Sequence, residues 1–310
     1  MLDALLVPLD GSHFSEHTLP LAAALSRSSG ATLHLAHVHR DHPPVHLLAN
    51  TQFHFEGLDL EEYEERHRVE ERDYLSGVAE KMKEETGLEP EQVLLEGEIV
   101  DALEGHARDI GARLILMTTH GRTGVSRAWL GSVADVLVRQ THLPVLLVRP
   151  AEGGNGAPAI LTMKHLLVPL DGSELSERIL PAVLEVARAM GSRVTLMSVV
   201  QPVVHVAARS LPLPAAHVEE RKAKAMEYLG QVAESLRRED IDTAVRVVAD
   251  TSPAAAVLSA VQSEGADLVA MCTHGHAGFT RAVLGSVADK VLRASPVPVL
   301  LERPLMEALG

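Results

Sequence analysis

The stretch Met117–Pro150, MTTHGRTGVSRAWLGSVADVLVRQTHLPVLLVRP, decides the fold, and the chain repeats it as Met271–Pro304, MCTHGHAGFTRAVLGSVADKVLRASPVPVLLERP. More than half of the positions are identical between the copies. Each copy shows the end of an apolar strand, a glycine-punctuated loop, a helix and a second apolar strand. A buried strand that leads through a glycine loop into a helix N-terminus commonly forms an anion or phosphate site. The repetition predicts one such site in each half of the chain.

The rest of the first half alternates short apolar runs with helical patterns. Strands are predicted at residues 4–9, 31–38, 92–96, 114–118 and 145–148, and helices at 15–28, 60–86, 99–110 and about 128–140. Such crossover connections predict an α/β fold, a mainly parallel five-stranded sheet with helices on both faces. Ligands in doubly wound sheets bind beyond the carboxyl ends of strands, where the strand order switches. The loops after Leu9 and Met117 are therefore expected to face one site.

The second half repeats this plan. His165–Ser173 (HLLVPLDGS) matches Ala4–Ser12 (ALLVPLDGS) in all but its first residue. The residues before this restart, AEGGNGAPAILTM, are rich in Gly, Ala and Pro and are typical of a linker. A duplication of this length predicts two similar domains rather than a short-period repeat. The predicted division is domain 1 at residues 1–150, a linker at 151–163 and domain 2 at 164–310.

Composition and charge exclude several classes of protein. The formal net charge is −14, which argues against nucleic acid or an anionic membrane as a main partner. Aromatic residues make up only 3% of the chain, so few rings could stack on bases. The single cysteine, Cys272, excludes an intramolecular disulfide. Because the chain opens without a signal-peptide pattern and no apolar run reaches about 18–20 residues, we expect a cytoplasmic protein.

Several motifs occur together, in the same order in both halves. The first half contains VPLDGS, THGRTGxxRxxLGSVAD and a closing PVLLVRP, and the second half contains matching segments. With these motifs the chain resembles a tandem two-domain member of the universal stress protein family. The resemblance covers nearly the whole chain apart from the linker and residues 40–58. It implies an adenine nucleotide alpha hydrolase-like fold and, in one branch of the family, a site for an adenine nucleotide.

That branch carries a glycine signature: Gly, two residues, Gly, nine residues, then Gly-Ser or Gly-Thr. The resemblance places its second glycine at Gly121 and Gly275, its third at Gly131 and Gly285, and its hydroxyl at Ser132 and Ser286. Glycine lets the backbone approach a ligand, and free N–H groups can then bind phosphate oxygens. The spacing alone leaves an alternative open, in which these glycines only permit a tight turn and close helix–sheet packing.

The first glycine of the signature is absent from both halves, where Thr118 and Cys272 stand instead. A β-branched residue or a thiol adds bulk where the backbone must approach a ligand, although Thr118 has a hydroxyl of its own to donate. This departure leaves a second function open beside nucleotide binding. It is a stress-related scaffold, or a sensor of another small ligand, with altered pockets.

The resemblance also implies contacts to the nucleoside. An acidic residue after the first strand, which would accept from a ribose hydroxyl, falls on Asp10 and Asp171. The alternative for this carboxylate is a structural role, capping the next helix or holding the loop. A main-chain contact to the adenine edge falls on Val38 and Val199.

The two halves differ just after the second glycine. Arg122 could bind a phosphate bidentately in domain 1, whereas His276 stands there in domain 2, so tighter binding is expected in domain 1. His120 and His274 precede the second glycines and would orient the loop or contact a phosphate. The full predicted sites are Pro8, Asp10, Val38, Thr118, His120, Gly121, Arg122, Gly131, Ser132 and Val133 in domain 1, and Pro169, Asp171, Val199, Cys272, His274, Gly275, His276, Gly285, Ser286 and Val287 in domain 2. The predicted ligand is ATP or another adenine nucleotide, and Mg²⁺ is its usual companion.

Other chemistry finds less support. His34, His37, His39, His42 and His46 invite a metal site, and His37 and His39 could share a strand face. Because no Cys and no Glu-x-x-His pattern joins them, we interpret them as surface or loop histidines. A Ser–His–Asp hydrolase would need a Gly-x-Ser-x-Gly elbow, which the sequence lacks.

The sequence favours a nucleotide-dependent regulator or sensor of the stress response. No Walker lysine or motif-placed general base supports fast catalysis, which leaves only slow hydrolysis of bound ATP open. The last strand of each half is apolar and would promote aggregation if left bare. We therefore expect each to pair with its counterpart, in this chain or in another, and predict a homodimer of tandem chains.

Overall fold

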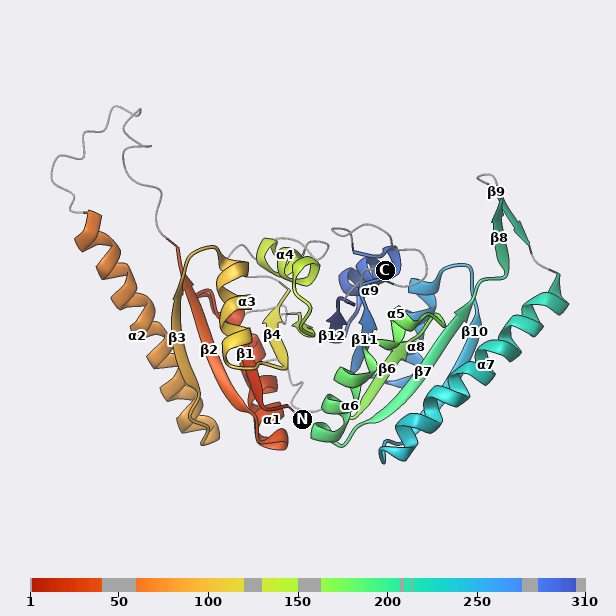
Figure 1. Ribbon diagram of the computed structural model, residues 1–310, viewed down its shortest axis with the longest axis horizontal. Helices are drawn as coiled ribbons and strands as arrows, with labels where there is room; N and C mark the ends of the chain where they lie inside the picture. Colours follow the sequence, from red (N-terminus) through yellow and green to blue (C-terminus); the bar gives the residue numbers. More distant parts are fainter. Residues whose placement is uncertain are drawn as a thin grey trace, which may run out of the picture.

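The protein is an α/β sandwich built twice (Figure 1). The computed structural model describes residues 2–40, 60–119, 130–149, 163–206, 209–212, 214–274 and 284–304. The elements of domain 1 are β1 (Ala4–Pro8), the 3₁₀ turn η1 (Ser15–Thr18), α1 (Leu19–Ser29), β2 (Thr32–His39), α2 (Leu60–Thr86), β3 (Glu91–Glu96), α3 (Ile99–Asp109), β4 (Leu114–Thr118), α4 (Ser132–Gln140) and β5 (Val145–Val148).

Domain 2 repeats this order and adds a two-stranded hairpin, β8 with β9, after its second strand. Its elements are β6 (His165–Pro169), α5 (Glu174–Glu177), α6 (Leu180–Met190), β7 (Arg193–Val200), β8 (Val203–Val206), β9 (Arg209–Pro212), α7 (Ala215–Arg238), β10 (Thr243–Ala249), α8 (Pro253–Glu264), β11 (Leu268–Cys272), α9 (Ser286–Ala294) and β12 (Val299–Glu302). The five-strand, doubly wound plan predicted from the alternating pattern is confirmed in both halves.

Two predicted helices begin later than their patterns indicated. The helix predicted at 15–28 is split into η1 and α1, because Pro20 has no N–H to continue the hydrogen bonding across that point. The helix predicted from about residue 128 starts at Ser132. Gly131 stays extended (φ −56°, ψ 147°) and donates its N–H to the Thr119 carbonyl oxygen at 2.7 Å, which keeps it out of the helix.

One sheet runs through both domains, in the order β10-β7-β6-β11-β12-β5-β4-β1-β2-β3. Neighbouring strands are parallel within each half, and the halves meet through the antiparallel pair β5 and β12. Leu146 lies opposite its own repeat counterpart, Leu300. The register therefore places a pseudo-twofold axis between these two leucines, as the mirrored arrangement in Figure 1 also shows. The counterpart pairing expected for the last strands is made inside this chain.

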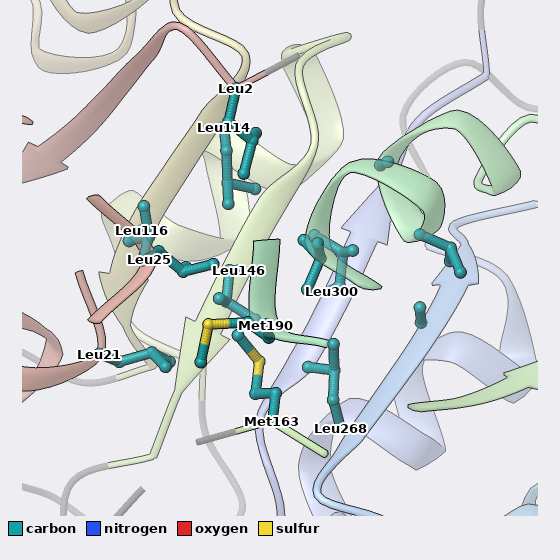
Figure 2. Close-up of a cluster of buried hydrophobic side chains, with 14 of the residues drawn as sticks. Leu2, Leu21, Leu25, Leu114, Leu116, Leu146, Met163, Met190, Leu268 and Leu300 are labelled. Carbon is teal, nitrogen blue, oxygen red and sulfur yellow. The ribbon is translucent and has the colours of Figure 1, made fainter. Parts of the chain in front are cut away.

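Each face of the sheet carries one hydrophobic core that crosses the domain boundary. One core contains α1, α2, α6 and α7 residues together with Leu146 and Leu300, and Figure 2 shows these two leucines close to Met163 and Met190. The other core lies under α3, α4, α8 and α9. Met163, the last residue of the predicted linker, is fully buried. The two domains therefore share their cores rather than touch at a rim.

Two arginines just beyond the last strands tie each domain to a helix of the other. The Arg149 guanidinium donates to the Arg293 carbonyl oxygen at 2.5 Å, at the C-terminal end of α9. The Arg303 guanidinium donates to the Gln140 carbonyl oxygen at 2.7 Å, at the C-terminal end of α4. Helix C-termini present carbonyls without intrahelical partners and carry partial negative charge, so a cation stabilises them. These contacts link the C-terminal ends of α4 and its counterpart α9 to the opposite domain.

Candidate functional site

Both candidate sites lie where the strand order switches. In domain 1 the order β3-β2-β1-β4-β5 places the switch between β1 and β4, and in domain 2 it falls between β6 and β11. The β1–β4 register pairs Leu5 with Leu114, and its continuation places Leu9 beside Thr118. The predicted meeting of the two loops at one sheet edge thus agrees with the strand register.

The loop after β1 is held by Asp10. Its Oδ1 accepts from the Ser12 backbone N–H at 3.0 Å and from the Ser12 hydroxyl at 2.5 Å. The Ser12 Oγ in turn accepts from the Ser15 N–H at 3.3 Å, at the start of η1. Gly11 between them has φ 79°, a left-handed conformation that favours glycine. This geometry shows the loop-holding role for the carboxylate.

The loop after β6 repeats these bonds atom for atom. The Asp171 Oδ1 accepts from the Ser173 N–H at 3.0 Å and from the Ser173 hydroxyl at 2.5 Å, and the Ser173 Oγ accepts from the Ser176 N–H at 3.1 Å. Asp171 is exposed, whereas Asp10 is half-buried. A carboxylate has about four acceptor positions, so it can accept from more than one donor at once.

The third glycines have a structural reason to be glycine. The Gly285 N–H donates to the Thr273 carbonyl oxygen at 2.8 Å, and a Cβ at Gly285 would lie only 2.6 Å from that oxygen. Gly131 donates to Thr119 in the same way, at 2.7 Å. Close packing of the helix start against the strand end accounts for this contact without a ligand. The glycine pattern alone therefore does not identify a phosphate site.

The helices that follow these glycines begin with open N-termini. The N-cap residues of α4 and α9 are Gly131 and Gly285, which have no side chain to accept from the first N–H groups. The next residues, Ser132 and Ser286, are exposed. Helix N-termini present unpaired N–H donors and partial positive charge. Each site therefore has the donor set that an anionic oxygen needs.

The predicted nucleoside contacts lie on the same face of the sheet as these helices. Val38 and Val199, near the ends of β2 and β7, are half-buried, as are Val133 and Val287 in the first turns of α4 and α9. All four pack against the core beneath α3, α4, α8 and α9. Pro8 and Pro169 at the ends of β1 and β6 are half-buried as well.

Thr118 and Cys272 are buried at the ends of β4 and β11, 6% exposed in both cases. Cys272 belongs to the core on the face opposite to Val199, and its Sγ lies 3.7 Å from the Ser176 carbonyl oxygen. Burial, with the Glu302 carboxylate, raises the pKa of the Cys272 thiol, which therefore stays protonated. The bulk that replaces the first glycine at this position is thus accommodated in the core.

The remaining predicted residues lie in or next to the loop itself. The His274 Nδ1 lies 2.9 Å from the Thr273 Oγ1. The predicted contacts His120, Gly121, Arg122, Gly275 and His276 lie outside the described residues.

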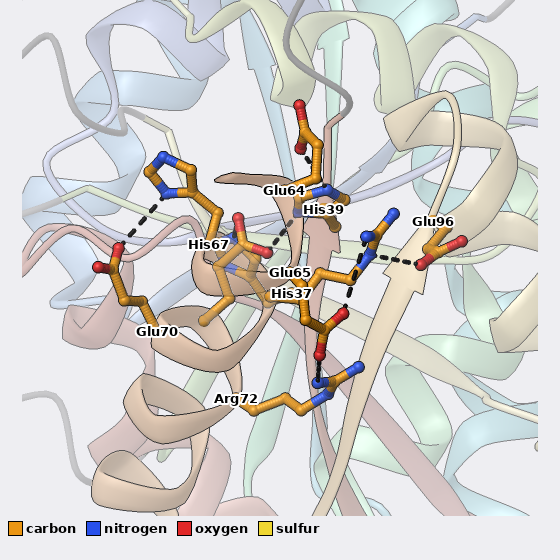
Figure 3. Close-up of polar contacts among 10 residues, drawn as sticks. His37, His39, Glu64, Glu65, His67, Glu70, Arg72 and Glu96 are labelled. Carbon is orange, nitrogen blue, oxygen red and sulfur yellow. Dashed lines mark hydrogen bonds and ion pairs between the residues drawn. The ribbon is translucent and has the colours of Figure 1, made fainter. Parts of the chain in front are cut away.

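The interpretation of the β2 histidines as surface residues is wrong for two of them. His37 and His39 are 4% and 1% exposed and face helix α2, where they contact two glutamates, Glu64 and Glu71. Figure 3 shows the two histidines with Glu64. A signal for this existed: both glutamates interrupt the stripe of α2 that also carries Tyr74 and Val78. His34 is half-buried, and His42 and His46 lie outside the described residues. Within the described ranges, no group of three or more His, Cys, Asp or Glu is placed to hold a metal ion.

Sequence reasoning also missed Glu302, at the end of β12. Burial and the nearby Glu185 carboxylate raise its pKa to about 7, against the lowering effect of Arg178 and Arg113. The matching residue of β5 is the apolar Val148. A glutamate within an apolar strand motif (PVLLE beside PVLLV) was the available signal.

Comparison with known proteins was consistent with this fold. A sequence model of the universal stress protein family matches residues 1–149 and 162–303. The universal stress protein Rv2005c of Mycobacterium tuberculosis is 29% identical over 194 residues, which are 62% of this chain and 62% of that protein. The chain thus matches less than two thirds of that relative's length. The universal stress protein Rv1996 of the same organism is 27% identical over 315 residues, 96% of this chain and 94% of that protein.

Two solved structures share the whole two-domain arrangement. A universal stress protein from Archaeoglobus fulgidus has a TM-score of 0.69 at 20% identity and covers 98% of this chain and 99% of its own. A putative universal stress protein from Pseudomonas aeruginosa has a TM-score of 0.64 at 16% identity, with 98% and 94% covered. At these identities the likeness shows the fold. None of the described helices is long and apolar enough to cross a membrane.

Proposed function

The chain belongs to the universal stress protein family, and we propose that it is a cytoplasmic regulator that binds an adenine nucleotide at both strand-order switch points. The observation that carries this proposal is the repeated constellation at each switch point. An open helix N-terminus at Ser132 or Ser286 faces the same sheet edge as the Asp10 or Asp171 loop.

The chemistry of each part suits one part of a nucleotide. The helix N-termini suit phosphate oxygens, because backbone N–H donors and the helix dipole act together there. The aspartate carboxylates suit a ribose hydroxyl, since an ionised carboxylate only accepts hydrogen bonds and a hydroxyl can donate one. The half-buried Val38 and Val199 offer apolar contact for a base.

The two sites are proposed to bind with unequal affinity. Arg122 in domain 1 and His276 in domain 2 occupy the position after the second glycine. A permanently charged, bidentate guanidinium binds a polyphosphate better than an imidazole does. Tighter binding in domain 1 follows.

Titration with ATP, with and without Mg²⁺, tests the function by calorimetry and native mass spectrometry. Ser132→Glu and Ser286→Glu place a negative charge at the first helical residue. This charge interacts favourably with the helix dipole, so no loss of stability is expected. Because it repels a phosphate, about a tenfold loss of affinity is expected at the altered site. These variants are sharper than Gly285→Glu, which would also displace the Thr273 carbonyl.

The matched controls are Val136→Glu in α4 and Lys290→Glu in α9, each one turn further along its helix. Val136→Glu adds a negative charge, and Lys290→Glu replaces a positive charge with a negative one. They should leave affinity within about twofold, because the dipole effect falls off beyond the first turn. If the unaltered protein does not bind ATP at millimolar concentration, nucleotide binding is refuted. The function would then be that of a scaffold or of a sensor of another ligand. A larger loss from Ser286→Glu than from Ser132→Glu would refute only the predicted order of affinities.

The predicted homodimer needs a surface other than the last strands, because β5 and β12 already cover each other within one chain. Light scattering over a range of protein concentrations tests it. A monomer at every concentration would remove the homodimer and leave the nucleotide proposal intact.

A further inference from the structure

A cluster of two buried histidines and two partly buried glutamates joins β2 to α2 in domain 1 only. The His39 Nδ1 lies 2.7 Å from the Glu71 Oε2, and its Nε2 lies 3.1 Å from the Glu64 Oε2. The His37 Nε2 lies 3.3 Å from the other oxygen of Glu71. The His39 side chain is 0% exposed, and those of Glu64 and Glu71 are 16% and 21% exposed. The contacts therefore form in an environment with little water.

Hydrogen-bond chemistry fixes how many protons the two contacts of His39 need. An ionised carboxylate only accepts, and a neutral imidazole has a single N–H to donate. Two ring nitrogens, each bonded to a carboxylate oxygen, therefore require one proton more than a neutral histidine carries. That proton lies on the ring or on one of the glutamates, and without it one of the two bonds is lost.

Domain 2 lacks all four groups at the matching positions. Ser198 and Val200 of β7 correspond to His37 and His39, and Val218 and Ala225 of α7 correspond to Glu64 and Glu71. The rest of the helix packing is shared: the Tyr74 hydroxyl donates to Glu16, and the Tyr228 hydroxyl donates to Glu177. Helix α7 therefore packs on β7 without such a cluster, which shows that this helix packing does not depend on it.

We propose that His37, His39, Glu64 and Glu71 form a proton-dependent clamp that holds helix α2 on strand β2. Rising pH removes the extra proton and opens one of the two His39–glutamate bonds, so α2 loosens in domain 1 while α7 does not.

Other charged groups near the clamp are paired with partners of their own. On the α2 side they are Arg68, which donates to Glu96 of β3 at 3.0 Å, and Tyr74, which donates to Glu16. Glu96 lies opposite His39 in the β2–β3 register, and β1, the other neighbour of β2, is apolar. In the described contacts, the carboxylates on the two nitrogens of the His39 ring are those of Glu71 and Glu64. If the proposed function holds, the clamp also regulates the domain 1 site, because Val38 lies between its two histidines.

Hydrogen exchange of the intact protein without nucleotide tests the clamp, with α7 as an internal control. Between about pH 6 and about pH 9, the protection of α2 amides should fall about tenfold or more relative to α7, after correction for intrinsic rates. Nitrogen chemical shifts of the His39 ring at the acidic end should show the extra proton within the cluster. Equal responses of α2 and α7 to pH overturn the proposal.

A domain 2-like variant separates the clamp from general loss of stability. His37→Ser, His39→Val, Glu64→Val and Glu71→Ala together should keep α2 protected and abolish its extra response to pH. The control His67→Gln removes a histidine of the same helix that pairs with Glu70 near the surface, and should keep the full response. An unchanged response in the fourfold variant overturns the proposal. So does a gain in α2 protection with Zn²⁺ that EDTA reverses, since the cluster would then be a metal site.

Discussion

Domain 1 and domain 2 build the same sheet and the same loops, but they differ in the charge that they bury. Their Asp–Ser loops repeat hydrogen bond for hydrogen bond. By contrast, domain 1 buries His39 between two glutamates where domain 2 has Val200, and domain 2 half-buries Glu302 where domain 1 has Val148. The difference teaches that loop geometry is the framework that the domains share, whereas the ionisable groups that they shield from water are specific to each domain.

The largest expected effect tests the part that the domains share. Leu146→Ala and Leu300→Ala each remove a fully buried side chain beside the pseudo-twofold axis. Each should lower the free energy of unfolding by about 3 kcal/mol, and by similar amounts, because each leucine packs in the same core. Urea denaturation measures this. A cost confined to one of the two variants would show that the halves do not share their core equally.

Glu302→Val tests the difference in buried charge between the domains, because it gives domain 2 the residue that domain 1 has at the matching position. The pKa of Glu302 in the folded protein, about 7, lies above its ordinary value of 4.5, so the folded state holds an extra proton between these values. The charge therefore costs nothing below about pH 4.5, and its full cost is reached above about pH 7. The variant should gain about 1–2 kcal/mol in the free energy of unfolding at pH 8, discounted because the carboxylate is only half-buried, and nothing at pH 4.5.

The reverse change supplies the control. Val148→Glu in β5 should destabilise the protein at pH 8 and less at pH 4.5, because it buries a carboxylate at the matching position. A gain from Glu302→Val that is the same at both pH values would mean that packing, and not charge, causes it.

Tyr74→Phe and Tyr228→Phe test a tyrosine–glutamate hydrogen bond that occurs in both domains. Burial and the neighbouring Glu16 or Glu177 carboxylate raise the pKa of Tyr74 and of Tyr228, so both phenols remain protonated donors at neutral pH. Each variant should lose about 1 kcal/mol of the free energy of unfolding, in line with one hydrogen bond. Thermal denaturation of both variants in parallel measures the loss. A loss in only one of the two variants would show that the two hydrogen bonds do not contribute equally.

The smallest expected effect concerns a contact between the domains that has no repeat counterpart. The Arg113 guanidinium lies 3.0 Å from the Glu185 carboxylate, and its own side chain is 52% exposed. Arg113→Ala should cost about 0.5 kcal/mol, because water screens the exposed Arg113 end of the pair although Glu185 is only 12% exposed, and about 1 M salt should remove most of the difference. A cost that persists in high salt would show that the pair holds the domains together more firmly than its exposure suggests.

Local patterns predicted the elements well, and burial less well. The helix at 60–86 has the predicted bounds, and strand β4 ends at Thr118 as expected. The start of α4 was predicted too early, because it depends on a bond between Gly131 and Thr119 that periodicity cannot show. The histidines of β2 were placed on the right strand but outside the core, since alternation gives a face and not what covers it.

The sequence by itself determined the duplication, the strand–loop–helix plan and the location of both candidate sites, because periodicity, glycines and repeated motifs are local properties. Only the tertiary structure decided that β5 pairs with β12 of the same chain, since an apolar strand edge pairs equally well with either copy. It also decided which carboxylates and histidines are shielded from water. Burial of Glu302 and His39 depends on helices and strands distant in the sequence, and only folding brings those charges together.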